Sequence, residues 1–463
     1  MRRSKKLREC QDGNCLDRIS SLPDDVLGHM LSFLPTRHAV RTSILSARWR
    51  CLFTLTACLS FNDEIFFGFN QEKETIDASR RFKEFVDKVL GLHQISPIKK
   101  FSLLCEGIYD NSDLNRWISN VLQKGVQELH YQPPVLTDCC VPDGFFMCGT
   151  LVKLYLDGMS FGHDKIEIPL SAWLPKLKIL HLDRISFFDF NSMERLFSSC
   201  ELLEELTLRD SYCDISGHAY KCIGILKVLR IEHCTFRSGT FEIDAPNLAY
   251  LTYSTNIGLK IVPSWKNSSF FKEAELNFRR CNEDSIKYDL ELLKAVACKA
   301  TKLYFETNLI KLFLRLDDDE QVPEFHCLSS LHLGACSWKY VISLLDKSPQ
   351  LKTVDFESGV LCCCNSECDC LDHCDCDCDC NSLSRIDIPL VPFSCHVDVI
   401  KVHEFCGHRG PMLLMGHLLR NASVLRSLIV YPVYGLGSEE ELKICKALLK
   451  LPRASTDCRV EMI

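Results

Sequence analysis

A short pattern, apolar-x-x-Leu-x-apolar, recurs along the chain and constrains its fold more than any other feature. Clear copies begin at Leu151, Leu177, Leu203, Leu226 and Leu248. Weaker copies begin at Ile98, Val126, Leu328, Leu351 and Leu425, and the register is blurred between 253 and 328. One copy cannot bury its own leucines, but adjacent copies stacked as parallel strands make them a continuous core. The 463 residues therefore predict a repeat array rather than several separate domains.

The copies resemble leucine-rich repeats, which implies a curved α/β solenoid of parallel strands and helices over residues 95–360. Aromatic residues recur at one offset, at Phe161, Phe187 and Phe236, and predict a stacked row on the convex side. The segment 112–125 has apolar residues at helical spacing and a terminal glycine, so we expect a helix between two strands there.

A different pattern precedes the repeats. Pro23 stands at a helix start, and Asp24 and Asp25 suit its first turn. Pro35 ends this helix, and Thr36 and Ser46 are placed to cap a second and a third. Three such short helices bury little surface alone, so their apolar face predicts a partner.

The stretch "LPDDVLGHMLSFLPTRHAVRTSILSARWRCLF", residues 22–53, resembles an F-box, which we assign to residues 17–60. The resemblance implies docking on the SKP-type adaptor of a cullin–RING ubiquitin ligase. The alternative is an N-terminal cap for the solenoid, because repeat arrays need caps. The residues expected to bind the adaptor are Leu22, Pro23, Leu27, Leu31, Leu34, Pro35, Val40 and Trp49.

The C-terminal segment, residues 385–463, looks like the FBD region that follows the repeats in a plant F-box/FBD/LRR family. The matching pieces are Val391-Pro392, Cys395, Phe405, Gly407, "LLRNA" and "VLRSL". The F-box, the repeats and this segment together cover most of the chain.

An insert rich in cysteine and aspartate, residues 361–384, separates the repeats from this segment. It holds nine of the 29 cysteines and six acidic residues. Thiolates at C-x-C spacing can bind zinc or copper(I), and the candidate ligands are Cys376, Cys378, Cys380 and His373. The alternative is a low-complexity loop without metal, which this composition favours. The other cysteines often occupy apolar strand positions and are interpreted as small buried residues.

Charge and targeting signals narrow the class of protein. The net charge of −7 predicts no nucleic-acid partner, and no apolar run is long enough to predict a membrane span. The basic tail, residues 1–16, is interpreted as disordered, with a nuclear import signal as the alternative. Without a signal peptide, the expected location is the cytoplasm, the nucleus or both.

No motif predicts catalysis or a cofactor. The sequence "GMSFG" at 158–162 matches a serine-hydrolase turn, but Ser160 aligns with Ser186 of the next repeat, which has no such turn. The expected function is therefore the non-catalytic substrate-recognition subunit of an SCF-type ubiquitin ligase. The alternatives are an interaction scaffold without ligase coupling and a metal-binding protein.

The target protein cannot be named from the sequence. Solenoids of this kind bind on the exposed positions of their strands, where the chain carries a mixture of charges. The candidate target-binding residues are Lys153, Tyr155, His181, Asp183, Arg209, Arg230 and Glu232.

Overall fold

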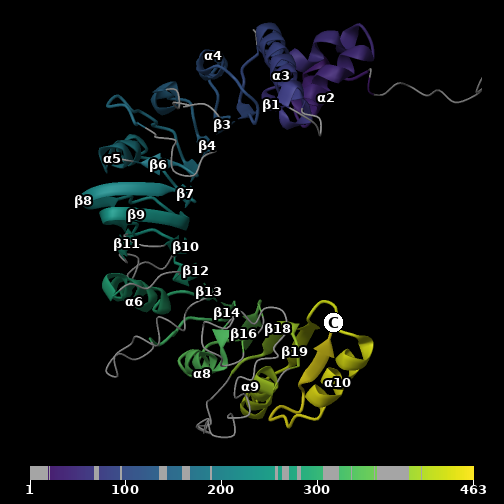
Figure 1. Cartoon of the computed structure of the whole chain (residues 1–463), viewed down its shortest axis with the longest axis vertical. Helices are drawn as coiled ribbons and strands as arrows, with labels where there is room; N and C mark the ends of the chain where they lie inside the picture. The colour runs from purple at the N-terminus through teal and green to yellow at the C-terminus, as the bar shows by residue number, and fades with distance from the viewer. Residues whose placement is uncertain are drawn as a thin grey trace, which may run out of the picture. The chain divides into compact units, whose positions relative to one another are not determined.

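The computed structural model describes most of the chain, which divides into two compact units at residues 1–144 and 145–463. The described residues are 19, 21–66, 72–93, 96–134, 143–158, 167–187, 190–255, 259–262, 271–278, 283–305, 323–334, 336–358, 360–361, 396–407 and 409–463. Each unit combines helices with parallel strands (Figure 1). The predicted class, an α/β chain with an N-terminal helical module and a long parallel sheet, is confirmed.

The first unit begins with a helical module and continues into three parallel strands. The module consists of α1 (Asp24–Leu31), α2 (Thr36–Arg41) and the 3-10 segments η1 (Thr42–Ile44) and η2 (Arg48–Leu55). The strands are β1 (Cys58–Asn62), β2 (Lys100–Leu104) and β3 (Glu128–Gln132), paired in that order. Between them lie η3 (Glu64–Phe66), α3 (Glu72–Leu92) and α4 (Asn111–Gln123), and η4 (Asp143–Met147) follows β3.

The module packs tightly around a small apolar core of Leu27, Leu31, Leu52 and Phe53. Gly28 lets α1 approach η2, because a Cβ atom at this position would lie 2.8 Å from Cβ of Leu55. The two predicted caps are wrong. Pro35 precedes α2, and Thr36 Oγ1 instead accepts a hydrogen bond from the Ser60 amide, 2.7 Å away. The third helix is a 3-10 segment preceded by Ala47, without a side-chain cap.

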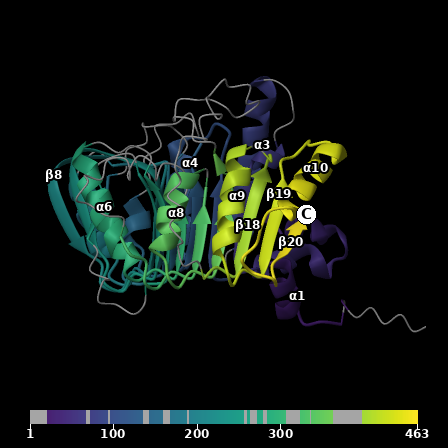
Figure 2. The same ribbon diagram turned by 90° about the horizontal axis from the view of Figure 1, so that it is seen from below.

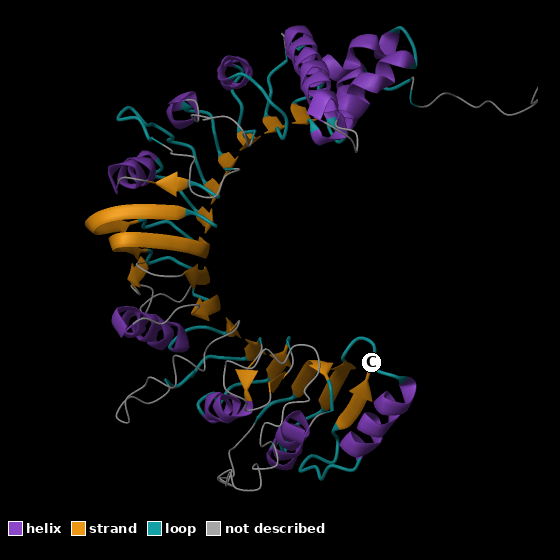
Figure 3. Cartoon of the chain, viewed as in Figure 1, coloured by secondary structure: helices purple, strands orange, loops and turns teal. Residues whose placement is uncertain are grey.

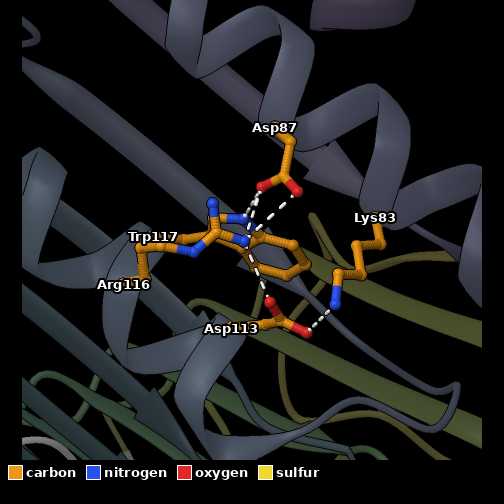
Figure 4. A network of polar contacts seen from close by, with 5 residues as sticks. All are labelled: Lys83, Asp87, Asp113, Arg116 and Trp117. Carbon is orange, nitrogen blue, oxygen red and sulfur yellow. Dashed lines mark hydrogen bonds and ion pairs between the residues drawn. The ribbon is translucent and has the colours of Figure 1, made fainter.

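Helices α3 and α4 of the first unit are joined by charged side chains (Figure 4). Asp87 of α3 accepts a hydrogen bond from Trp117 Nε1 at 2.6 Å and pairs with Arg116 at 2.9 Å. Asp113 pairs with Arg116 at 2.9 Å and with Lys83. Partial burial opposes ionisation of Asp113, but hydrogen bonds from Lys83 and Arg116 outweigh it and lower the pKa of Asp113. Helix α4 confirms the helix expected at 112–125.

The second unit is built on one long ladder of parallel strands (Figures 2 and 3). In pairing order these are β4 (Lys153–Asp157), β5 (Ile179–Asp183), β7 (Glu205–Arg209), β9 (Val228–Asp244), β10 (Tyr250–Thr255), β12 (Glu273–Phe278), β13 (Lys302–Phe305), β14 (Ser330–Leu333), β16 (Thr353–Phe356), β18 (Val399–Phe405), β19 (Ser427–Pro432) and β20 (Arg459–Met462). Helices α5 (Phe190–Ser199), α6 (Glu283–Ala297), α8 (Trp338–Asp346) and α9 (Arg409–Asn421) lie along one face of the ladder, and α10 (Ser438–Leu449) contacts α9 and β20.

Two rows of buried side chains run along this ladder. Leu154, Leu180, Leu206 and Leu229 are direct neighbours in one row, and Leu156, Leu182, Leu208 and Ile231 form the other. The blurred copies join the same register, since Ala274 and Leu303 continue the first row. The FBD-like segment continues it as well, through Ile400 and Leu428.

A second strand layer covers part of the ladder. It contains β6 (Ser186–Phe187), β8 (Tyr212–Cys222), the far half of β9, and β11 (Leu259–Val262). Elsewhere β15 (Cys336–Ser337) pairs with β17 (Val360–Leu361). The predicted aromatic row holds only in part. Buried Phe187 and Phe236 are separated in register by Cys213, and Phe161 lies outside the described residues.

Helix α6 places a carboxylate in the interior. Asp289 is 6% exposed, and the Tyr253 hydroxyl of β10 lies 3.5 Å from its Oδ1. Burial raises the pKa of Asp289 to about 7, although the hydrogen bond from Tyr253 acts in the opposite direction.

The close contact at Gly28 predicts a difference between two glycines of the first unit. Gly28→Ala should lower the free energy of unfolding by about 1–3 kcal/mol, because its methyl group overlaps Leu55. Gly91→Ala in α3 meets no atom within 4 Å and should raise stability by about 0.5–1 kcal/mol through helix propensity. Urea unfolding measures the free energy of unfolding of both variants. Equal changes in the two variants would contradict the close packing at Gly28.

The burial of Asp289 predicts a pH-dependent loss of stability. Its folded-state pKa lies above the unfolded value of about 3.9, so the folded state favours the protonated acid. The contribution of Asp289 to the free energy of unfolding is therefore fully present below pH ~4. It falls by roughly 2–4 kcal/mol as the pH rises to ~7. Asp289→Asn should flatten this dependence. Chemical denaturation of both proteins from pH 4 to 8 measures it, and parallel curves would refute the assignment.

Candidate functional site

The helical module carries exposed apolar side chains as well as an apolar core. Phe33 is 76% exposed, Ile44 86% and Leu45 65%, and Val26, Met30 and Leu34 are also exposed. Apolar side chains this accessible cost free energy in water unless another surface covers them. The module therefore presents a candidate docking surface, which we define as Val26, Met30, Phe33, Leu34, Ile44 and Leu45.

The structure divides the adaptor residues predicted from the sequence into two groups. Leu27 and Leu31 are 0% and 3% exposed and form the interior of the module, so their side chains offer no contact area to a partner in this structure. That these two residues bind the adaptor stays a prediction, and their burial places them beneath the surface of the module, because an apolar helix stripe fills the core of its own module first. Pro23, Leu34 and Pro35 are exposed, and Leu22, Val40 and Trp49 are half-buried.

Sequence reasoning missed Phe33, Ile44 and Leu45. These residues lie at the ends of short helices or between them, where spacing alone does not show which apolar side chains face inward. A signal existed, because apolar residues that fall outside the buried stripe of so small a module have few places to be covered.

Polar contacts hold the helical module together and join it to the rest of the first unit. Arg48 pairs with Asp24 at 2.6 Å and donates to the Leu22 carbonyl, which joins η2 to the start of α1. Arg37 of α2 donates to the Ile65 carbonyl at 3.3 Å and lies 5.1 Å from the centroid of Phe66. The module is therefore anchored to the chain that follows β1.

The face of the ladder opposite α5, α6, α8 and α9 is the second candidate surface. The structure brings all seven predicted target-binding residues together on β4, β5, β7 and β9. Tyr155, His181 and Arg230 occupy the central row, interrupted by Thr207 on β7. Lys153 lies in the row on one side, and Asp183, Arg209 and Glu232 lie in the row on the other.

These residues largely neutralise one another. The rings of Tyr155 and His181 meet edge to face at 4.6 Å. Glu205 lies 3.3 Å from His181 Nε2 and pairs with Arg230. Arg209 pairs with Glu232 at 2.7 Å. Burial lowers the pKa of His181, and the hydrogen bond to Glu205 opposes this shift. This part of the face is therefore ordered and close to charge balance.

Among the cysteines whose burial the structure describes, six are buried, three are half-buried and four are exposed. Cys105, Cys148, Cys200, Cys213 and Cys234 are buried, and none of the described cysteines forms a disulfide. Burial raises the pKa of Cys200 to about 11 and that of Cys234 to about 12, so both stay protonated at neutral pH. Their interpretation as small apolar residues is confirmed, whereas Cys51, Cys222, Cys298 and Cys327 are exposed.

Several candidate residues of the sequence fall outside the part of the chain that the structure describes. These are Ser160 of the "GMSFG" stretch and the possible metal ligands Cys376, Cys378, Cys380 and His373. Within the described ranges, no group of three or more His, Cys, Asp or Glu side chains is arranged to hold a metal ion. A helix with the length and apolar character needed to cross a membrane is likewise not found among the described residues.

Comparison with known proteins identifies two parts of the chain. The family profile of the F-box domain matches residues 19–57, which include the helical module. A second profile, described as the LRR repeats of the FBD-associated F-box protein At5g56370, matches residues 114–267.

Relatives from Arabidopsis thaliana align with most of the chain. F-box/LRR-repeat protein At4g14103 is 32% identical over 74% of this chain and 91% of its own length. F-box/LRR-repeat protein At3g58930 is 30% identical over 90% of each chain. F-box protein At3g59000 is 31% identical over 90% of this chain and 87% of its own. With its helical module, its parallel ladder and these relatives, the chain belongs to the plant F-box/LRR-repeat family.

Proposed function

We propose that this protein is the substrate-recognition subunit of an SCF-type ubiquitin ligase. F-box domains in general bind an SKP-type adaptor, and F-box/LRR proteins in general serve such ligases as substrate adaptors. The single observation that carries the proposal for this chain is its docking surface, a set of exposed apolar side chains within the matched F-box region.

The docking surface suits a stable protein partner. Covering one large apolar side chain contributes roughly 1.5–3 kcal/mol, so a few such contacts at the centre of an interface supply much of its affinity. Phe33 and Ile44 expose most of their area and are the strongest candidates for anchoring residues. Leu27 and Leu31 would support this surface from beneath.

The proposed mechanism is positional. The docking surface fixes the chain to the adaptor, and through it to a cullin–RING ligase, while the strand face holds a target protein. Holding the target near the ligase raises the effective concentration of its lysines around the transferred ubiquitin. In this role the chain contributes binding surfaces and no catalytic residue. A location in the cytoplasm or nucleus, where such ligases act, remains part of the proposal.

The adaptor proposal predicts a strong effect of charge on the docking surface. Leu34→Asp and Ile44→Asp should each weaken binding to a purified SKP-type adaptor by more than ~10-fold, because each places a carboxylate in an apolar interface. The matched control is Ile76→Asp on α3 of the same unit, where the isoleucine is also exposed. Isothermal titration calorimetry compares the three variants with the parent chain.

Circular dichroism of the same preparations should show unchanged unfolding, since all three side chains are exposed. If the parent chain fails to bind the adaptor, the alternative of an interaction scaffold without ligase coupling replaces the proposal. If Ile76→Asp weakens binding as much as Ile44→Asp, the docking surface has been assigned to the wrong residues.

A further inference from the structure

Beyond β10, the face of the ladder opposite the helices carries a second group of charged and aromatic side chains. The central row continues through Glu275, Tyr304, His332, Asp355 and Lys401, which are direct neighbours on β12, β13, β14, β16 and β18. Two aromatic–imidazole pairs stand on this part of the face. Tyr304 stacks on His332 with ring centroids 4.1 Å apart and ring planes 19° apart.

Several carboxylates lie near Tyr304, on β12 and on β16 or directly after it. The pKa of Tyr304 is raised first by burial and then by the negative charges of Glu273, Glu357, Glu275 and Asp355. Glu273 and Glu275 are on β12, one strand from Tyr304, and Glu357 follows β16. One of them, Glu357, accepts a hydrogen bond from His332 Nδ1 at 2.9 Å and so turns toward the stacked pair.

Asp355 is a buried member of this group with incomplete hydrogen bonding. Its side chain is 9% exposed, and its Oδ1 atom makes no hydrogen bond to any described residue. Two nitrogen atoms lie near this carboxylate: His403 Nε2 is 3.2 Å from Oδ1, and Lys401 Nζ is 3.8 Å from Oδ2. His403 in turn stacks on Tyr431 of β19 at 4.3 Å. A buried carboxylate oxygen without a hydrogen bond gains from an additional donor.

This region differs in charge from the strands before it. On β4 to β9 the charged residues pair among themselves, as in Arg209 with Glu232 and Arg230 with Glu205. Around Tyr304, four carboxylates face the cations Lys302 and Lys401. We call the set Glu273, Glu275, Tyr304, His332, Asp355 and Glu357 the acidic aromatic patch.

We propose that the acidic aromatic patch binds a segment of the target protein that carries an arginine or a lysine, with the cation placed over the Tyr304 ring. This inference rests on the proposed function, since it names the chemistry of the target that the strand face would hold. A cation over an aromatic face gains electrostatic attraction from the ring, and the surrounding carboxylates add charge-assisted hydrogen bonds. Arginine suits the site best, because its planar guanidinium can stack on Tyr304 while donating to more than one carboxylate.

The test uses fluorescent peptides as probes for the full-length chain. One nonapeptide alternates arginine with glycine and serine, a second has glutamine in place of arginine, and a third has glutamate. Fluorescence anisotropy should show binding of the arginine peptide, weaker binding of the glutamine peptide and none of the glutamate peptide. Raising the salt concentration should weaken binding of the arginine peptide, because part of the attraction is between charges near the surface.

Two variants remove the proposed contacts without removing buried bulk. Tyr304→Leu deletes the aromatic face, and Glu275→Gln with Glu357→Gln deletes two charges. Each should weaken binding of the arginine peptide by about three- to ten-fold. The controls are Tyr434→Leu, exposed after β19, and Glu439→Gln, exposed on α10, and neither should change the affinity.

Equal affinity for the arginine and glutamate peptides, or equal losses in the controls and the patch variants, would overturn the inference. Adaptor binding is measured on the same preparations, so the two proposals fail separately. A chain that binds the adaptor but not the arginine peptide keeps the proposed function and loses the acidic aromatic patch as its target site.

Discussion

Parallel pairing between strands too short to bury their own side chains is the interaction on which the second unit depends. Leu180 of β5 is buried, and Leu154 and Leu206 lie beside it at the same level of the sheet. The same dependence explains why the FBD-like segment is structurally continuous with the repeats. Val399 pairs with Thr353 of β16, so β18 completes the burial of the preceding repeat. The end of the recognised repeats at residue 360 is therefore no boundary in the ladder.

Strong leucine spacing made most of the ladder predictable, and its weaker members show where sequence reasoning fails. The copies at Leu177 and Leu203 have leucine at both inward positions and are plain in the sequence. Strand β12 places Ala274 in the first row, and β18 places Ile400 in the first row and Val402 in the second. A buried position in a row can hold any apolar side chain that fills the space between its two neighbours. A search for leucine spacing therefore misses strands that have other apolar residues there. Helix α3 was missed although Ala78, Phe82 and Val86 repeat at helical spacing.

The sequence predicted that the helical module docks on a partner, but it predicted less well which residues of the module are exposed. An apolar helical module at the front of the chain pointed to docking, yet the sequence could not say which apolar residues face inward. Leu27 and Leu31 fill the core, and Phe33 and Ile44 stand outside it. On the strand face, alternation gave the correct side for all seven predicted residues. It could not show that Glu205 and Glu232 already neutralise Arg230 and Arg209, because such pairs depend on register between strands.

The separation of the two buried rows from the central exposed row has a consequence for how such chains diversify. Thr252, Glu275 and Tyr304 are consecutive members of the exposed row, and each touches mainly its two neighbours. Replacing one of them alters a small area of surface and leaves the rows at Leu251 and Tyr253 intact. The side chains of this row can therefore change one at a time while the folded state is preserved. Related chains with this fold can therefore differ widely on the exposed row, because each substitution there carries a low risk of unfolding the protein.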